Sequence, residues 1–193
     1  MIVGNPTIFA IESEITKAYE RPSFRALGYF VIHVSGRCYG VKEPDATLLA
    51  VSFDEVGRRI DGRGSHESPF PMDAKAKEIA HAFRVACYGN WDEKGQFFGM
   101  SAREFDKAIN AKRLMWAPDG DEAFDDGSYV LQFEDQSMVR LVAFASSPDS
   151  LYDTDTLRDV WLSNVEFYEI LHQWRDRIRA EWEGHPKSPD GND

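Results

Sequence analysis

The sequence has 193 residues, of which 42% are hydrophobic and 13% aromatic, and its formal net charge is −11. This length suits one domain with a full core. The absence of an eighteen-residue apolar run or a basic-then-apolar N-terminus argues against a membrane span and a signal peptide. Two cysteines, Cys38 and Cys87, are too few for a disulfide framework, so we expect reduced thiols in a cytoplasmic protein.

Alternating apolar residues in the first forty positions predict the start of an antiparallel sheet. Segments 7–15 and 26–34 have the period-two pattern of half-buried strands, and a turn at Ser35-Gly36 leads into a third strand over 37–42. A short apolar run follows at 47–51. Later segments must cover the apolar face of this sheet.

Two sites with capping-box spacing predict the starts of helices in the middle of the chain. Ser52 and Glu55 predict a helix over 53–60, and Ser101 and Glu104 predict one that runs to about residue 113. Between them lie a Gly- and Pro-containing loop at 61–71, a helix over 73–88 that ends at Gly89, and a short strand over 96–100.

The last third of the chain predicts an acidic loop over 118–127, paired strands over 128–134 and 137–145, and one long helix. Apolar residues recur at threes and fours from 156 to 182, and Thr154 or Asp155 could cap this helix. Residues 184–193 are polar, which predicts a disordered tail. We therefore expect a single α+β domain over 1–183, an antiparallel β-sheet with helices packed mainly on one face.

The opening residues resemble a known family. The segments that carry the resemblance are Met1-Ile-Val-Gly-Asn-Pro6, Phe9-Ala-Ile-Glu12, Gly28-Tyr-Phe30, the Gly36…Gly40 turn and the run from Ala46 to Val56. Together they are similar to immunity protein family forty-two, from bacterial polymorphic toxin and contact-dependent growth inhibition systems. The resemblance implies a non-catalytic protein that binds and neutralises a cognate toxin domain. It covers about the first third of the chain and supplies no catalytic residue.

The residues themselves contain no motif of catalysis or metal binding. The acidic loop has Phe124 and Val130 where a calcium-binding EF-hand loop needs glycine and glutamate. His66 beside Glu67 is the one histidine–carboxylate pair in the sequence that could be arranged for proton transfer, and sequence proximity alone is weak support for that role. We expect no metal and no cofactor.

The negative charge is concentrated late in the chain. Residues 1–96 carry 13 acidic and 12 basic side chains, whereas 115–169 carry 13 acidic side chains against Arg140 and Arg158, a balance of 2 − 13 = −11. Such a field repels nucleic acid and membrane phosphates and attracts a basic partner, although a solubilising surface is the alternative interpretation.

This window supplies the candidate toxin-binding residues. They are Asp119, Asp121, Glu122, Asp125, Asp126, Asp149, Asp153 and Asp155. Their carboxylates could imitate the phosphates that a nuclease binds, so we expect a basic toxin domain, a nuclease, as the partner. Two other functions remain open. One is a small hydrolase or transferase with loop 61–71 as a lid, and the other is a scaffold module.

Overall fold

The computed structural model describes residues 1–23, 25–89, 95–118, 120–148 and 150–189. Its first sheet, sheet A, has the strand order β1 (Ile2–Asn5), β2 (Phe9–Tyr19), β3 (Ala26–Val34), β4 (Arg37–Tyr39). Two short strands join it: β5 (Thr47–Leu48) pairs with β3, and β12 (Lys187–Ser188) pairs with β2. All pairings in sheet A are antiparallel except the one between β12 and β2.

A second antiparallel sheet, sheet B, stands beside sheet A. Its order is β11 (Asp153–Ser163), β10 (Met138–Ala145), β9 (Ser128–Glu134), β8 (Met115–Ala117). The helices are α1 (Leu49–Asp61), α2 (Ala76–Tyr88), α3 (Ala102–Ala111) and α4 (Asn164–Gly184), with a short 3-10 turn η1 (Glu122–Phe124). A hairpin of β6 (Gln96–Phe97) and β7 (Met100–Ser101) precedes α3.

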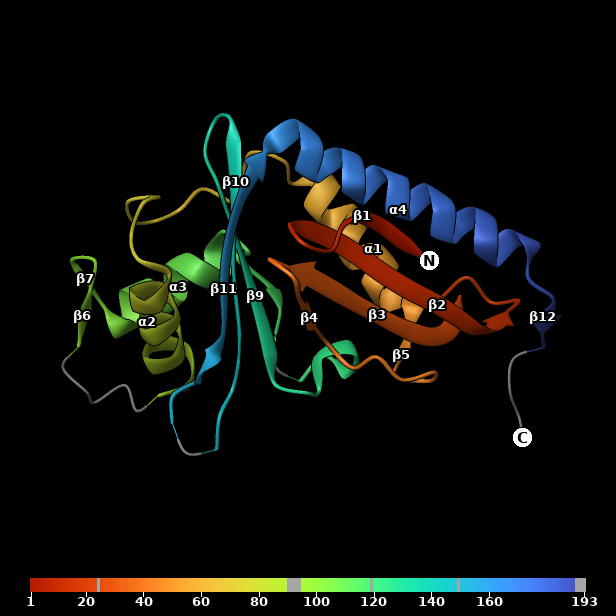
Figure 1. The fold of residues 1–193 in the computed structure, drawn as a ribbon, viewed down its shortest axis with the longest axis horizontal. Coiled ribbons are helices and arrows are strands. Elements are labelled where there is room, and N and C mark those ends of the chain that lie inside the picture. Colours follow the sequence, from red (N-terminus) through yellow and green to blue (C-terminus); the bar gives the residue numbers. More distant parts are fainter. Residues whose placement is uncertain (24, 90–94, 119, 149, 190–193) are drawn as a thin grey trace.

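Sheet B is buried on both faces because it separates two hydrophobic cores. Val139 and Leu141 of β10 point into a core shared with sheet A, α1 and α4, whereas Val142 and Phe144 point into a second core with α2 and α3. Figure 1 shows α4 lying along sheet A, and α2 and α3 on the opposite side of sheet B. The α+β class, the antiparallel pairing and the long C-terminal helix are confirmed, and the strands form two main sheets rather than one.

The predicted start of the last helix is wrong. Residues 153–163 form β11, and α4 begins only after Ser163, whose side chain accepts a hydrogen bond from the Glu166 amide. Thr154 and Asp155 therefore do not cap the helix. The threes-and-fours spacing continued through β11 by coincidence: Thr156 and Leu162 alternate into the core as strand residues, both nearly inaccessible.

The two predicted capping boxes had opposite outcomes. Ser101 and Glu104 form both reciprocal bonds at the start of α3. Helix α1 instead begins at Leu49 without a side-chain cap, and Ser52 is buried inside it. The carboxylate of Glu55 accepts hydrogen bonds from Arg58 and Arg59 in the same helix, so it is not available to cap the start.

The end of the chain makes a contact that the sequence did not predict. Lys187 and Ser188 pair with Ala18 and Tyr19 of β2, so part of the segment predicted as a disordered tail is ordered. Residues 190–193 lie outside the described residues. The assignment of 1–183 to one domain stays a prediction.

Candidate functional site

The predicted acidic residues that the structure describes gather at one end of sheet B. Ala145, the last residue of β10, pairs with Ser128 at the start of β9 and with Asp153 at the start of β11. The loop before β9 and the start of β11 therefore flank the same strand end, at the bottom of sheet B in Figure 1. Asp119 and Asp149 lie outside the described residues.

The loop before β9 is fastened to sheet A. Phe124 is buried with its ring centroid 6.2 Å from that of Phe30, and the Val41 amide donates to the carbonyl of Ala123 over 2.8 Å. Gly40 lies where two segments of the chain, the one after β4 and the one before β9, come close together. Its φ is +109°, and a Cβ there would lie 2.8 Å from the Ala123 carbonyl oxygen. This contact holds the acidic segment in place before any partner arrives.

Two of the predicted carboxylates hold the loop together. Asp121 accepts a hydrogen bond from the Ala123 amide, and burial raises its pKa. Asp126 accepts from the Gly40 amide at 3.2 Å and from the Ser128 amide and hydroxyl at 3.0 and 2.8 Å. Because these oxygens are already bonded, they contribute charge to the surface more than direct contacts.

The other carboxylates of this end are exposed. Glu122 and Asp125 make no hydrogen bond or ion pair with the rest of the described chain. Asp153 and Asp155 are exposed at the start of β11, where the Asp155 amide donates to Asp153. These four side chains can face a partner. We define the acidic end as Asp121, Glu122, Asp125, Asp126, Asp153 and Asp155.

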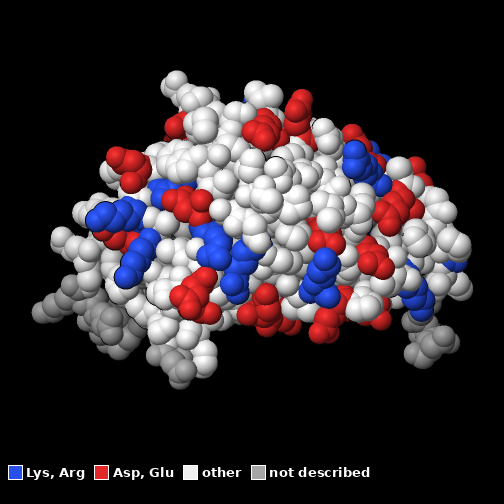
Figure 2. Space-filling model, viewed as in Figure 1, with Lys and Arg blue, Asp and Glu red and all other residues white. Residues whose placement is uncertain are grey.

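The surface around the acidic end is not uniformly negative. Figure 2 shows carboxylates along the lower edge of this face, with lysine and arginine side chains among them. Arg158 of β11 folds back along the chain to donate to the carbonyls of Asp155 and Leu157 at 3.0 and 2.8 Å. The balance of −11 for residues 115–169 already includes Arg158, so this arginine affects where the charge lies and not its total.

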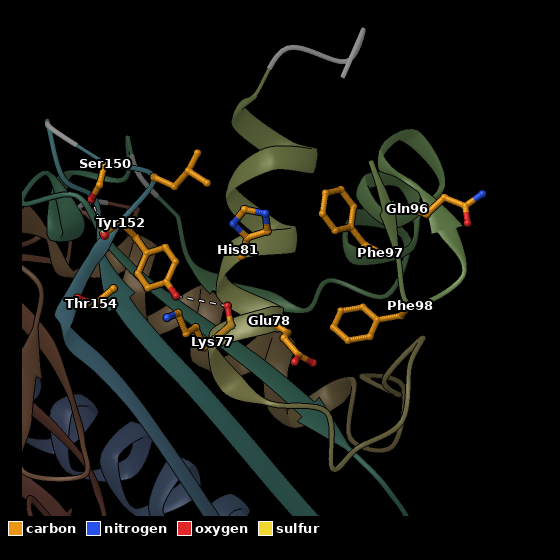
Figure 3. Close-up of a pocket in the computed structure, with 10 residues that line it drawn as sticks. Lys77, Glu78, His81, Gln96, Phe97, Phe98, Ser150, Tyr152 and Thr154 are labelled. Atoms are coloured by element: carbon orange, nitrogen blue, oxygen red, sulfur yellow. Dashed lines mark hydrogen bonds between the residues drawn. The ribbon is translucent and has the colours of Figure 1, made fainter. Parts of the chain in front are cut away.

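A groove of about 930 Å³ lies beside the start of β11. Figure 3 shows its walls: His81 and Glu78 from α2, Phe97 and Phe98 from the hairpin, and Tyr152 opposite them. The groove is mainly apolar and continues to Thr154, between two carboxylates of the acidic end. An apolar side chain of a partner could be buried here next to a negatively charged rim.

Sequence reasoning paired His66 with the wrong carboxylate. The imidazole Nδ1 lies 3.1 Å from Glu134, which is 68 positions away, and both side chains are buried. Glu67 instead accepts from Lys112 at 2.7 Å. Burial raises the pKa of Glu134, but hydrogen bonds from His66, Tyr168 and the Gly64 amide outweigh it and the net shift is downward. This buried network ties loop 62–75 to sheet B and does not support the lid hypothesis.

A second network on the outer face of sheet A was also missed. The Glu12 carboxylate accepts from Tyr29 at 3.1 Å and lies 2.9 Å from the His33 Nε2 and 2.7 Å from the Lys42 ammonium. Burial raises its pKa, yet these partners lower it overall, so Glu12 stays ionised. No local motif could have revealed this cluster, because strand register brings its members together.

Other chemistry finds little support among the described residues. No group of three or more His, Cys, Asp or Glu side chains there is placed to hold a metal ion. Both cysteines are half-buried and free, and burial raises the pKa of Cys87 to about 12, which disfavours the reactive thiolate. None of the described helices has the length and apolar character needed to cross a membrane.

Of the three aromatic side chains in the predicted last helix that could anchor a partner, one escapes the cores. Sequence reasoning placed Trp161, Tyr168 and Trp174 on one helix, and Trp174 and Tyr168 are indeed buried helix residues. Trp161 lies on β11, is 39% exposed, and stacks under the Arg140 guanidinium, 5.1 Å from its ring centroid. An exposed tryptophan is a frequent interface anchor.

Comparison with known proteins identifies the family. The profile of Immunity protein 42 (Imm42) matches residues 1–177. The crystal structure of CdiI from Burkholderia dolosa AUO158 has the same fold, with a TM-score of 0.57 and 18% sequence identity over 92% of this chain and 99% of that one. No curated protein matches the chain significantly. The match over nearly the whole sequence shows that the chain belongs to the Immunity protein 42 family, the immunity proteins of polymorphic toxin systems.

Proposed function

We propose that this protein neutralises a basic toxin domain, a nuclease, by binding it one-to-one through the acidic end of sheet B. Immunity proteins are typically not enzymes, so protection depends on occupancy rather than turnover. The proposed toxin belongs to a contact-dependent growth inhibition system or a related polymorphic toxin system, and this protein binds it in the cytoplasm. The observation that carries it is the convergence of two acidic segments, far apart in sequence, at one strand end.

The geometry supports binding by a surface that exists before the partner arrives. Buried Phe124 and the hydrogen bonds of Asp121 and Asp126 hold the acidic loop, and the β10 ladder holds the start of β11. A preformed surface loses little conformational entropy on binding. Since blockade must outlast exposure to toxin, we expect a nanomolar Kd or tighter, on the order of −12 kcal/mol.

The acidic end and the groove would divide the work of binding. Exposed carboxylates accelerate the encounter with a basic protein, and this effect weakens as salt screens the charges. The apolar walls of the groove, Phe97, Phe98 and Tyr152, would then bury a side chain of the toxin and slow dissociation.

The test uses the cognate toxin domain, which we expect to be encoded at the C-terminus of a protein whose gene lies next to the gene for this chain. The triple variant Glu122→Lys, Asp125→Lys, Asp155→Lys reverses three exposed charges. We expect association to slow by about tenfold at low salt and its salt dependence to weaken. The matched control reverses Asp61, Asp73 and Asp176, which are exposed elsewhere and change the net charge equally. If both variants associate at the same rate, the acidic end is not the binding surface.

The proposed nuclease class has its own assay. Carboxylates in the acidic end would occupy the cationic site that holds nucleic acid phosphates, so bound toxin should lose activity on nucleic acid at one equivalent of this protein. If this protein binds the toxin domain but that domain leaves DNA and RNA intact, the proposed immunity function stands and the proposed nuclease class is wrong.

A further inference from the structure

Strand β11 forms a long open edge of sheet B. It spans eleven residues, Asp153–Ser163, and pairs only with β10 among the strands of the described chain. In Figure 1 it passes in front of β10 and β9, so its outer edge is on the face drawn in Figure 2. Exposed edges of this length are normally shortened, covered, or interrupted by proline, bulges or charged side chains. Strand β11 contains no proline; its register shift lies near Ala143, and the stretch from Asp159 to Ser163 pairs regularly with β10.

The phase of the ladder shows which backbone groups face outward. The Asn164 amide donates to the carbonyl of Ser137, just before the Met138–Ser163 pair. In an antiparallel ladder this bond makes Met138–Ser163 a non-hydrogen-bonded pair. Bonded and non-bonded pairs alternate along β11, so every second residue from Ser163 backward turns its N–H and C=O away from β10.

Within the continuous register the outward residues are Asp159, Trp161 and Ser163, and Leu157 lies just beyond the register shift. Arg158 already occupies the carbonyl of Leu157 at 2.8 Å. The backbone groups of Asp159 and Trp161 have no hydrogen-bond partner in the described part of the chain. The Trp161 side chain is exposed, and the Asp159 carboxylate accepts hydrogen bonds from Arg140 at 2.9 and 2.7 Å. No described strand pairs with the outward backbone groups of these two residues.

We propose that β11 accepts an extended, basic strand of the toxin domain, which pairs with the outward groups of Asp159 and Trp161 and extends sheet B. Asp153 and Asp155 of β11 outnumber Arg158 and give this edge a charge that suits a basic strand, whereas Asp159 is already paired with Arg140. A second copy of this chain suits it less, because each copy carries −11. Exposed Trp161 supplies the hydrophobic contact beside the added strand.

This inference rests on the proposed function, since it names how the same partner is held. It also explains why the acidic end includes the first residues of β11. Asp153 and Asp155 would meet the basic partner first, and the strand would then pair along the edge toward Trp161. Binding through main-chain hydrogen bonds fixes orientation and register, while side-chain neighbours select the partner.

The first test compares Trp161→Pro with Trp161→Ala in the full chain. Both variants lose the indole, but only proline also loses the outward N–H and places a ring on the edge. We expect the proline variant to bind the neighbouring-gene toxin domain about fivefold to tenfold more weakly than the alanine variant. Equal Kd values for two folded variants would overturn the proposal while leaving the immunity function intact.

The second test needs no substitution. In the free protein the amides of Asp159 and Trp161 should exchange rapidly with solvent, and in the complex they should become protected. The amides of Val160 and Leu162 bond to β10, so they are the internal control and should be slow in both states. If the amides of Asp159 and Trp161 gain no protection in the complex, the proposed strand pairing is wrong. It is also wrong if the free protein dimerises and these amides are protected in the dimer. If the wild-type chain forms no complex with the toxin domain, the proposed function itself is overturned.

Discussion

Replacing Glu134 with glutamine tests the buried network that joins loop 62–75 to sheet B. The carboxylate accepts hydrogen bonds from His66 at 3.1 Å, Gln132 at 2.6 Å and the Gly64 amide at 2.6 Å, and from the Tyr168 hydroxyl. Glutamine has almost the same shape but places an NH₂ group where one carboxylate oxygen stood. At least one buried donor then faces another donor.

The expected cost follows from those contacts. Hydrogen bonds to a charged group contribute about 1.5–3 kcal/mol, and a buried donor without a partner costs about 1–3 kcal/mol. We therefore expect Glu134→Gln to lower the free energy of unfolding by about 3–5 kcal/mol. With a urea m-value of about 2 kcal/mol/M, the midpoint falls by roughly 2 M. The control is Glu67→Gln, whose carboxylate is 68% exposed, and its midpoint should hardly move.

The acid dependence gives an independent check. Because the pKa of Glu134 is lowered in the folded state, its stabilisation is complete above the unfolded value of about 4.3 and is lost as pH falls through the folded pKa. Urea midpoints of the wild type and Glu134→Gln should therefore begin to approach each other only below about pH 4.3, and they should meet once the pH is below the folded pKa. A midpoint loss under 0.5 M at pH 7, or a gap that persists unchanged in acid, would refute this reasoning.

Three further substitutions probe separate parts of the fold. Trp174→Ala empties a fully buried site and strands the Ser13 hydroxyl, so we expect a loss of about 3–5 kcal/mol by urea denaturation; a loss below 1 kcal/mol would contradict the packing. Arg59→Met removes the donor to the Met115 carbonyl, and about 2–4 kcal/mol should be lost unless water replaces it. Ser101→Ala should cost about 1 kcal/mol while toxin affinity stays constant, and a weaker complex would place α3 in the interface.

Local patterns in this sequence predicted local structure well. The strand over Ala26–Val34 has the predicted bounds, because its β-branched and aromatic residues favour a strand; seven of its nine residues are buried, so burial does not alternate along it. The capping box at Ser101 was also predictable from local sequence, because Ser101 and Glu104 are three residues apart and both are exposed. Ser52 has the same spacing, but its segment belongs to the interior of a helix whose apolar face begins at Leu49. Packing decided that start, and spacing alone carries no information about packing.

Long-range pairing was beyond the sequence. Glu134 meets His66, and Glu12 meets Lys42, only because strand register and loop closure bring them together. Residues 156–163 were predicted as helix because Leu157, Val160 and Trp161 also fit helical spacing. Their partner strand, β10, lies earlier in the chain and its pairing is not visible in a local window. The acidic residues were found from composition, whereas their convergence at one strand end was not.

The burial of sheet B on both faces limits where this protein can bind a partner. Val139 and Leu141 belong to one core and Val142 and Phe144 to the other, so a partner cannot use either face of β10 without unfolding a core. What remains accessible of sheet B is the strand end, with its carboxylates, and the edge of β11. Replacing Asp125 or Asp155, both of which are exposed, changes that surface without altering core packing. If the proposed surface is the one that binds, substitutions there would change the partner while the free energy of unfolding stays nearly constant, because the two cores supply the stability.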